Sequence, residues 1–119
     1  MKSNWRRREG VETKADGSVL ASVLVPSDSP WFSGHFPGDP VLPAIAQLEM
    51  TLDAARKAFG RELIPKAISR TKYRKIIRPD DVVNIVLSPI EDETMTLRFQ
   101  LTVNGELACK GLMKMASTK

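Results

Sequence analysis

A histidine and a glutamate fourteen positions apart are the residues of this chain best suited to acid–base chemistry. His35, the only histidine among 119 residues, lies in the Pro- and Gly-rich stretch 34–43 (GHFPGDPVLP), and Glu49 follows on a predicted helix. Imidazole has an unperturbed pKa of about 6.5, so it can act as a base near neutral pH. Desolvation on an apolar helical face disfavours a charged carboxylate, so Glu49 could donate a proton. A base and an acid of this kind can form a proton-transfer site.

The same two residues also have a purely structural interpretation. A lone histidine in a loop is usually held by hydrogen bonds, and a lone glutamate on a helix is usually solvated. The start of the helix favours chemistry, because the N–H groups of Ala44 and Ile45 have no acceptor within the helix and could stabilise an oxyanion. Residue types and spacing alone leave both interpretations open.

A stiff loop and a helix are predicted to position this pair. The prolines at positions 30, 37, 40 and 43 stiffen the loop, because each fixes φ and restricts the residue before it. The helix is predicted from Pro43 to Phe59, with Gly60 just past its end. Apolar side chains at three- and four-residue spacing give it one apolar face: Ile45, Leu48, Leu52, Ala55 and Phe59.

Alternating apolar residues predict strands on both sides of the helix. Two short segments, 5–14 and 19–25, are joined at the turn signal Asp16-Gly17. Four candidates follow the helix: 67–76, 81–89, 94–103 and 106–116. Asn104-Gly105 predicts a tight hairpin into the last of them. One long helix followed by an antiparallel meander is an α+β domain.

The loop and the helix together resemble a known family signature. Residues 31–50 (WFSGHFPGDPVLPAIAQLEM) look like that of the β-hydroxyacyl-acyl-carrier-protein dehydratases of fatty-acid synthesis, which reads His-Phe-Pro-Gly-x-Pro-x-x-Pro-Gly before a helix carrying the acid. Residues 72–81 (KYRKIIRPDD) are similar to the family's Lys-Phe-x-x-x-Val-x-Pro-Gly-Asp stretch. The resemblance covers most of the chain. It implies one hotdog domain over residues 1–119, an antiparallel sheet wrapped around one central helix.

The resemblance also implies a reaction and a role for each site residue. A (3R)-3-hydroxyacyl thioester on acyl carrier protein would lose water to give the trans-2-enoyl thioester. His35 would be the catalytic base and Glu49 the acid. The Ala44 N–H would polarise the thioester oxygen, and the Val41 carbonyl would orient the imidazole. Glutamate as the acid is typical of the branch that does not isomerise the double bond. No metal or other cofactor is implied.

Two departures from the family pattern leave other functions open. Ala44 and Asp80 each stand where the family has glycine. Ala44 keeps its N–H but adds a methyl group where the thioester must approach. A non-catalytic acyl-binding or assembly module therefore remains an alternative. A hotdog thioesterase or hydratase acting on coenzyme A esters is another.

The partners implied are a second subunit and an acyl carrier protein. The family builds each site at a homodimer interface, and a trimer of dimers is left open. A basic cluster could dock the acidic carrier protein, or it could be a solvated strand face: Arg70, Lys72, Arg74, Lys75 and Arg78. Four side chains could line an acyl tunnel or belong to an ordinary core: Trp31, Phe32, Phe36 and Ile45.

Composition bears on nucleic-acid binding, membrane insertion and cellular location. The net charge of +4 comes from 18 basic and 14 acidic residues, a mixed surface that does not favour nucleic acid. Tyr73 is the only aromatic residue among the clustered cations, which argues further against single-stranded nucleic acid. The apolar runs are too short for a membrane segment. Cys109 is the only cysteine, which favours the reducing cytoplasm and predicts a small buried hydrophobe.

Overall fold

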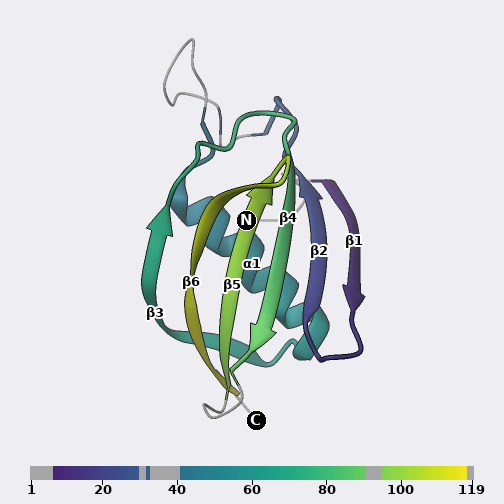
Figure 1. Cartoon of the computed structure of the whole chain (residues 1–119), viewed down its shortest axis with the longest axis vertical. Helices are drawn as coiled ribbons and strands as arrows, with labels where there is room; N and C mark the ends of the chain where they lie inside the picture. Colours follow the sequence, from purple (N-terminus) through teal and green to yellow (C-terminus); the bar gives the residue numbers. More distant parts are fainter. Residues whose placement is uncertain (1–6, 30–31, 33–40, 91–94, 118–119) are drawn as a thin grey trace.

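A six-stranded antiparallel sheet curves around one helix (Figure 1). The computed structural model describes residues 7–29, 32, 41–90 and 95–117. In chain order the elements are β1 (Arg7–Thr13), β2 (Val19–Leu24), α1 (Ala44–Phe59), β3 (Leu63–Tyr73), β4 (Val82–Pro89), β5 (Thr96–Val103) and β6 (Glu106–Ser117). This architecture confirms the α+β class and the sheet wrapped around a helix. In the described part of the chain, no helix is long and apolar enough to cross a membrane.

The helix begins and ends close to where the sequence predicts. Pro43 precedes it in an extended conformation, and Gly60 follows it with φ of 143°, a value that favours glycine. The predicted apolar face is only partly the buried one: Ala55 is buried, and Leu48 and Leu52 pack partly buried against the core. Ile45 and Phe59 are 65% and 39% exposed, and the buried residues are Ala46, Gln47, Met50, Thr51, Ala54 and Ala55. Small side chains face the sheet because they let the helix approach it closely.

The core lies between α1 and the inner face of the sheet. Apolar residues alternate along the central strands as predicted, and the largest fully buried side chains include Phe99, Ile85, Leu87 and Leu101. Cys109 is fully buried, as predicted for a small hydrophobe. The Asn104-Gly105 turn is confirmed, with φ of 53° and 79°. These are the positive values that a two-residue hairpin requires.

The position of β3 corrects the predicted meander. The sheet order is β1-β2-β4-β5-β6-β3, so β3 pairs with β6 at an edge and not with its successor β4. The strand also begins at Leu63, four residues before the predicted start at Ala67. Pro65 is tolerated because one side of β3 has no neighbouring strand and a register shift follows between Pro65 and Ala67. After Leu63, no residue of β3 is fully buried.

The connection between β3 and β4 crosses one end of the sheet and ties down the start of the helix. Ile77 is fully buried there, and its carbonyl accepts a hydrogen bond of 2.8 Å from the Leu42 N–H. The Asp80 N–H donates to the Val25 carbonyl at 2.9 Å. Asp80 has φ of 67°, so aspartate adopts the left-handed conformation expected at this position.

Candidate active site

Glu49 lies half-buried on α1, one turn after the exposed Ile45. Among the described residues, no hydrogen bond or ion pair engages its carboxyl group. Asp53, one turn further on, differs, because it lies 3.8 Å from the Lys57 ammonium. Glu49 therefore offers a carboxyl group that no neighbour in the described chain neutralises, on a helix face that the sheet does not cover.

The start of α1 exposes backbone donors. Ala44 is the first helical residue and is exposed, and no side chain caps the helix. The Pro43 carbonyl accepts from the N–H groups of Ala46 and Gln47 at 3.1 and 3.2 Å. In the described chain no acceptor meets the N–H groups of Ala44 and Ile45. The first helical turn carries no acidic residue either, so these donors remain suited to an oxyanion.

Two hydrogen bonds fix the segment that leads into the helix. Leu42 is 3% exposed; besides the bond from its N–H to Ile77, its carbonyl accepts from the Gln47 side-chain amide at 3.2 Å. Val41 and Ala44, two predicted site residues, lie on either side of this anchored stretch. Val41 and Ala44 thus lie at the start of α1, and Glu49 lies five residues beyond Ala44 on the same helix.

Three predicted site residues, His35, Trp31 and Phe36, lie outside the described residues. The other two predicted tunnel residues occupy different environments. Phe32 is 7% exposed and belongs to the core cluster, whereas Ile45 is 65% exposed in the single chain. Within one chain, Phe32 therefore fits the core interpretation. Ile45 could line a tunnel only together with a second surface.

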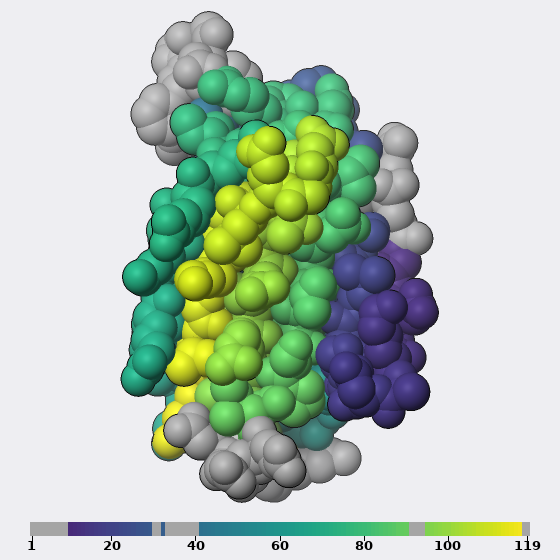
Figure 2. Space-filling view, in the orientation of Figure 1, coloured from purple at the N-terminus to yellow at the C-terminus, as the bar shows by residue number. Residues whose placement is uncertain are grey.

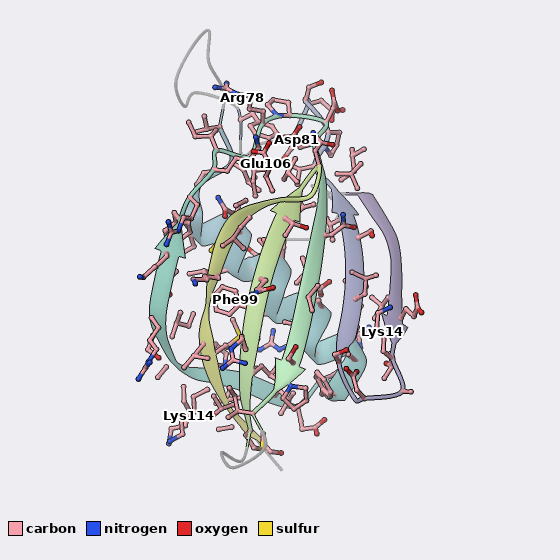
Figure 3. All side chains as sticks on the ribbon, in the orientation of Figure 1. Lys14, Arg78, Asp81, Phe99, Glu106 and Lys114 are labelled. Carbon is pink, nitrogen blue, oxygen red and sulfur yellow. The ribbon has the colours of Figure 1, made fainter. Side chains whose placement is uncertain are left out.

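The predicted basic cluster divides into two parts. At the end of the sheet near the start of α1, Lys75 forms a 3.1 Å ion pair with Glu106, and the Arg78 N–H donates to the Asp81 carboxylate at 2.8 Å. Figure 3 shows Arg78, Asp81 and Glu106 grouped at this end. The Lys75 ammonium is therefore partly neutralised by Glu106, and the Asp81 carboxylate is bound to the backbone beside the Arg78 side chain. Arg74 is exposed and follows β3 directly.

The other part lies on the outer, helix-free face of the sheet, the face seen in Figure 2. Here a depression of about 460 Å³ is lined by Arg70, Lys72, Arg98, Gln100, Lys110, Gly111 and Leu112. In the described chain, none of its four cations forms an ion pair. Sequence reasoning missed Arg98 and Lys110, because only the strand register places them beside Arg70 and Lys72. Lys72 lies directly opposite Lys110, a repulsive arrangement.

A second cavity, of about 380 Å³, lies at the far end of α1. Its lining is mainly apolar and includes Phe59, Leu63, Ile90, Met95 and Met115. A helix of 16 residues spans about 24 Å. This cavity is therefore remote from Ala44 and is not part of the candidate site.

Two side chains near the β3 edge have altered acidity. Burial raises the pKa of the Cys109 thiol to about 11. Partial burial, followed by the nearby Cys109, raises the pKa of Tyr73 above its usual range. Neither group is set up to be a base or nucleophile near neutral pH. Among the described residues, no three His, Cys, Asp or Glu side chains lie close enough together to hold a metal ion.

Comparisons with known proteins agree on one family and one fold. A family model described as ApeI-like, ApeI dehydratase, matches residues 11–112. A relative from Rickettsia bellii (strain OSU 85-389), 3-hydroxyacyl-[acyl-carrier-protein] dehydratase FabZ, is 32% identical over 110 residues, covering 84% of this chain and 76% of the relative.

Two solved structures share the architecture. The dehydratase heterocomplex ApeI:P from Xenorhabdus doucetiae aligns with a TM-score of 0.83 and 22% identity over 98% of this chain and 99% of the other. A hypothetical thioesterase from Streptococcus pneumoniae TIGR4, solved with coenzyme A, aligns with a TM-score of 0.68 and 18% identity. The alignment covers 92% of this chain and 84% of the thioesterase. The hotdog fold expected from the signature is thereby confirmed.

Proposed function

Because this chain belongs to the ApeI-like dehydratase family, we propose that it removes water from (3R)-3-hydroxyacyl thioesters carried on acyl carrier protein. The product would be the trans-2-enoyl thioester. The observation that carries this proposal is that α1 holds both a half-buried Glu49 and exposed N–H groups at its start, and that neither meets a partner among the described residues. These are the acid and the oxyanion donors that an elimination next to a thioester needs.

The proposed mechanism assigns one step to each group. His35 removes the proton from the carbon beside the thioester carbonyl, and negative charge develops on the thioester oxygen. The Ala44 N–H stabilises that oxygen. Glu49 in its protonated form gives a proton to the 3-hydroxyl group, the C–O bond breaks, and water leaves as the double bond forms. The Val41 carbonyl orients the His35 imidazole. The thioester itself acidifies the proton, so the step needs no cofactor.

A second subunit would complete this site. The edge strand β3 exposes Ile64, Ile68 and Tyr73, which are 41%, 39% and 47% exposed. An exposed apolar edge is the usual template for pairing with another strand. We therefore propose assembly through β3, as a homodimer with sites at its interface. The Xenorhabdus neighbour belongs to a dehydratase heterocomplex, so a non-identical hotdog partner is the second candidate.

The carrier protein would dock on the basic depression of the outer face. Carrier proteins are acidic, and the four cations there lack ion-pair partners in the described chain, so they complement such a surface. Arg70 and Lys72 keep the docking role expected from the sequence, and Arg98 and Lys110 join them. Arg74, Lys75 and Arg78 are the weaker candidates, because they lie outside the depression and Lys75 already pairs with Glu106. The cytoplasmic location expected from the single cysteine stays a prediction.

One observation favours a different function. The Ala44 methyl group stands at the exposed start of α1, where the family has glycine, and could hinder the approach of the thioester. A binding or assembly module would then retain the acyl site without turnover. The fold shared with a hypothetical thioesterase also keeps open a hydrolase or hydratase of coenzyme A esters.

The deciding experiment measures turnover of 3-hydroxyacyl carrier-protein substrates of several chain lengths by mass spectrometry. His35→Ala and Glu49→Gln should each lower the rate on the order of 10²–10⁴-fold, because each removes an acid–base partner. Asp53→Asn is the matched control on the same helix and should retain activity. Coenzyme A esters of the same acyl groups test the alternatives. Acyl binding by a wild type that shows no turnover would support a binding module and contradict the dehydratase.

A further inference from the structure

The side chain of Gln47 is an unusual choice for a buried position on α1. It is 5% exposed, and its neighbours on the same buried face are mostly apolar. Its Nε2 donates to the Leu42 carbonyl at 3.2 Å. Its Oε1 has no hydrogen-bond partner in the part of the chain that the structure describes. If Nε2 and Oε1 exchanged positions, Oε1 would face the Leu42 carbonyl oxygen, and two acceptors would meet. The hydrogen bond to Leu42 therefore determines the orientation of the amide.

This arrangement gives Gln47 little role in stability. A neutral hydrogen bond stabilises a protein only modestly, and a buried acceptor without a partner costs at least as much. The two effects at best cancel. An apolar side chain of the same length would fold at least as well. A glutamine at this position therefore needs another explanation, and its hydrogen bond to the Leu42 carbonyl suggests one.

That hydrogen bond acts on the segment that leads into the proposed site. Leu42 donates its N–H to the Ile77 carbonyl at 2.8 Å and accepts from Gln47 on its other side. Its peptide groups are thus held between the helix and the connection from β3 to β4. Val41 lies immediately before this clamp and Ala44 two residues after it. Their backbone groups are the ones proposed to orient the imidazole and to stabilise the oxyanion.

We propose that Gln47 is a positioning residue that fixes the backbone from Val41 to Ala44. This inference rests on the proposed function of the same site. Gln47 acts through Leu42 and does not meet the reacting atoms, because residues two apart on a helix point to different faces and Gln47 cannot share the face of Glu49. Its role is geometric: misplacement of a catalytic group by about 1 Å can lower a rate about 100-fold.

The test compares Gln47→Met with Thr51→Val. Methionine matches the length of glutamine but cannot donate to Leu42. Thr51, one turn further along the same buried face, donates its hydroxyl to the Gln47 carbonyl at 2.9 Å, so Thr51→Val removes a buried hydrogen bond while leaving the Leu42 clamp intact. Gln47→Met should lower kcat by about 10- to 100-fold with KM and the unfolding midpoint little changed. Thr51→Val should keep the wild-type kcat.

Hydrogen exchange of the Leu42 amide gives a readout that does not depend on turnover. We expect exchange to quicken about tenfold in Gln47→Met and to stay unchanged in Thr51→Val, because only the first loosens the bond to Ile77. Unchanged Leu42 exchange, or wild-type kcat, in Gln47→Met would overturn the inference. A fall in the unfolding midpoint parallel to the loss of kcat would overturn it too. An inactive wild type would contradict the proposed function alone, and Leu42 exchange would then decide the positioning role.

Discussion

The ring of Phe99 occupies the space that a side chain at Gly111 would need. A Cβ atom on Gly111 would lie 2.7 Å from the Phe99 Cζ and 3.1 Å from the Thr71 hydroxyl oxygen. Phe99 is fully buried and lies opposite Gly111 in the register of β5 and β6 (Figure 3 labels Phe99). The glycine thus leaves room for the ring of Phe99, the largest fully buried side chain among the described residues.

Gly111→Ala should destabilise the fold by about 1–3 kcal/mol, because the added methyl group overpacks the core. Chemical denaturation measures the change. Phe99→Leu alone should also destabilise the protein, but the double variant should lose less than the sum of the two. Strict additivity would show that the two positions do not compete for space.

Ala44→Pro isolates the contribution of one backbone N–H. Proline is well tolerated at the first helical position, and Pro43 already has φ of −63° and ψ of 155°, the conformation required before a proline. The variant should fold normally and lose about 10²–10³-fold in kcat, as expected on removal of one oxyanion donor. Ala44→Gly keeps the N–H and is the control. Retention of full kcat by Ala44→Pro would exclude this N–H from catalysis.

Arg98→Ala combined with Lys110→Ala tests the docking surface. The double variant should raise KM for the carrier-protein substrate by about tenfold or more, because it removes two of the four cations, while kcat is unchanged. Turnover of a short pantetheine thioester without carrier protein should not change. Lys14→Ala is the control, an exposed cation 4.0 Å from Glu12 and far from the depression. Equal effects on both substrates would argue against docking there.

The charges of β3 should govern how the chain assembles. The strand carries Lys66, Arg70 and Lys72 and no acidic residue, so pairing with an identical strand brings like charges together. Self-association measured by sedimentation should therefore strengthen with salt, which screens the repulsion. A variant with all three residues changed to glutamate should pair preferentially with the wild type at low salt. Mixed dimers should then exceed the one half of all dimers that random pairing gives. A statistical mixture at every salt concentration would show that edge charge does not select the partner.

Cys109 makes stability depend on alkaline pH. Burial raises its pKa from the ordinary value of 9.0 to about 11 in the folded protein. Between these values the unfolded state loses the proton and the folded state keeps it, so the free energy of unfolding falls as pH rises, by up to about 3 kcal/mol. Cys109→Ala should show a shallower decline above about pH 9 in the same titration. Parallel curves for the two proteins would contradict the burial argument.

Local patterns predicted most of the elements. The helix, the hairpin at Asn104-Gly105 and the alternation along β5 depend on neighbours in sequence, and the structure confirms them. The position of β3 in the sheet could not be predicted from local patterns, because its pairing with β6 joins segments that are far apart in the sequence. The early start of β3 was hidden by Pro65, which looks like a strand breaker unless the strand lies at an edge.

The candidate site, too, was only partly predictable from the sequence. Glu49 and Ala44 could be singled out because a carboxyl group and a helix start are visible in the sequence, although the roles assigned to them and to His35 stay predictions. Arg98 and Lys110 gave no signal, since each is an ordinary exposed residue until register places them side by side. Gln47 looks like a solvated helical residue, and only its burial reveals otherwise. The buried helix face was predicted from the spacing of apolar residues, but close approach to the sheet favours small residues such as Ala46 and Ala54.

The uncovered edge also bears on the life of a newly made chain. In the single chain, β3 presents apolar residues such as Ile64 and Ile68 along an unpaired backbone, the kind of surface that nucleates aggregation. The interspersed cations act as gatekeepers, because stacking many copies would accumulate positive charge. The repulsion that weakens self-pairing thus protects the orphan subunit from precipitating.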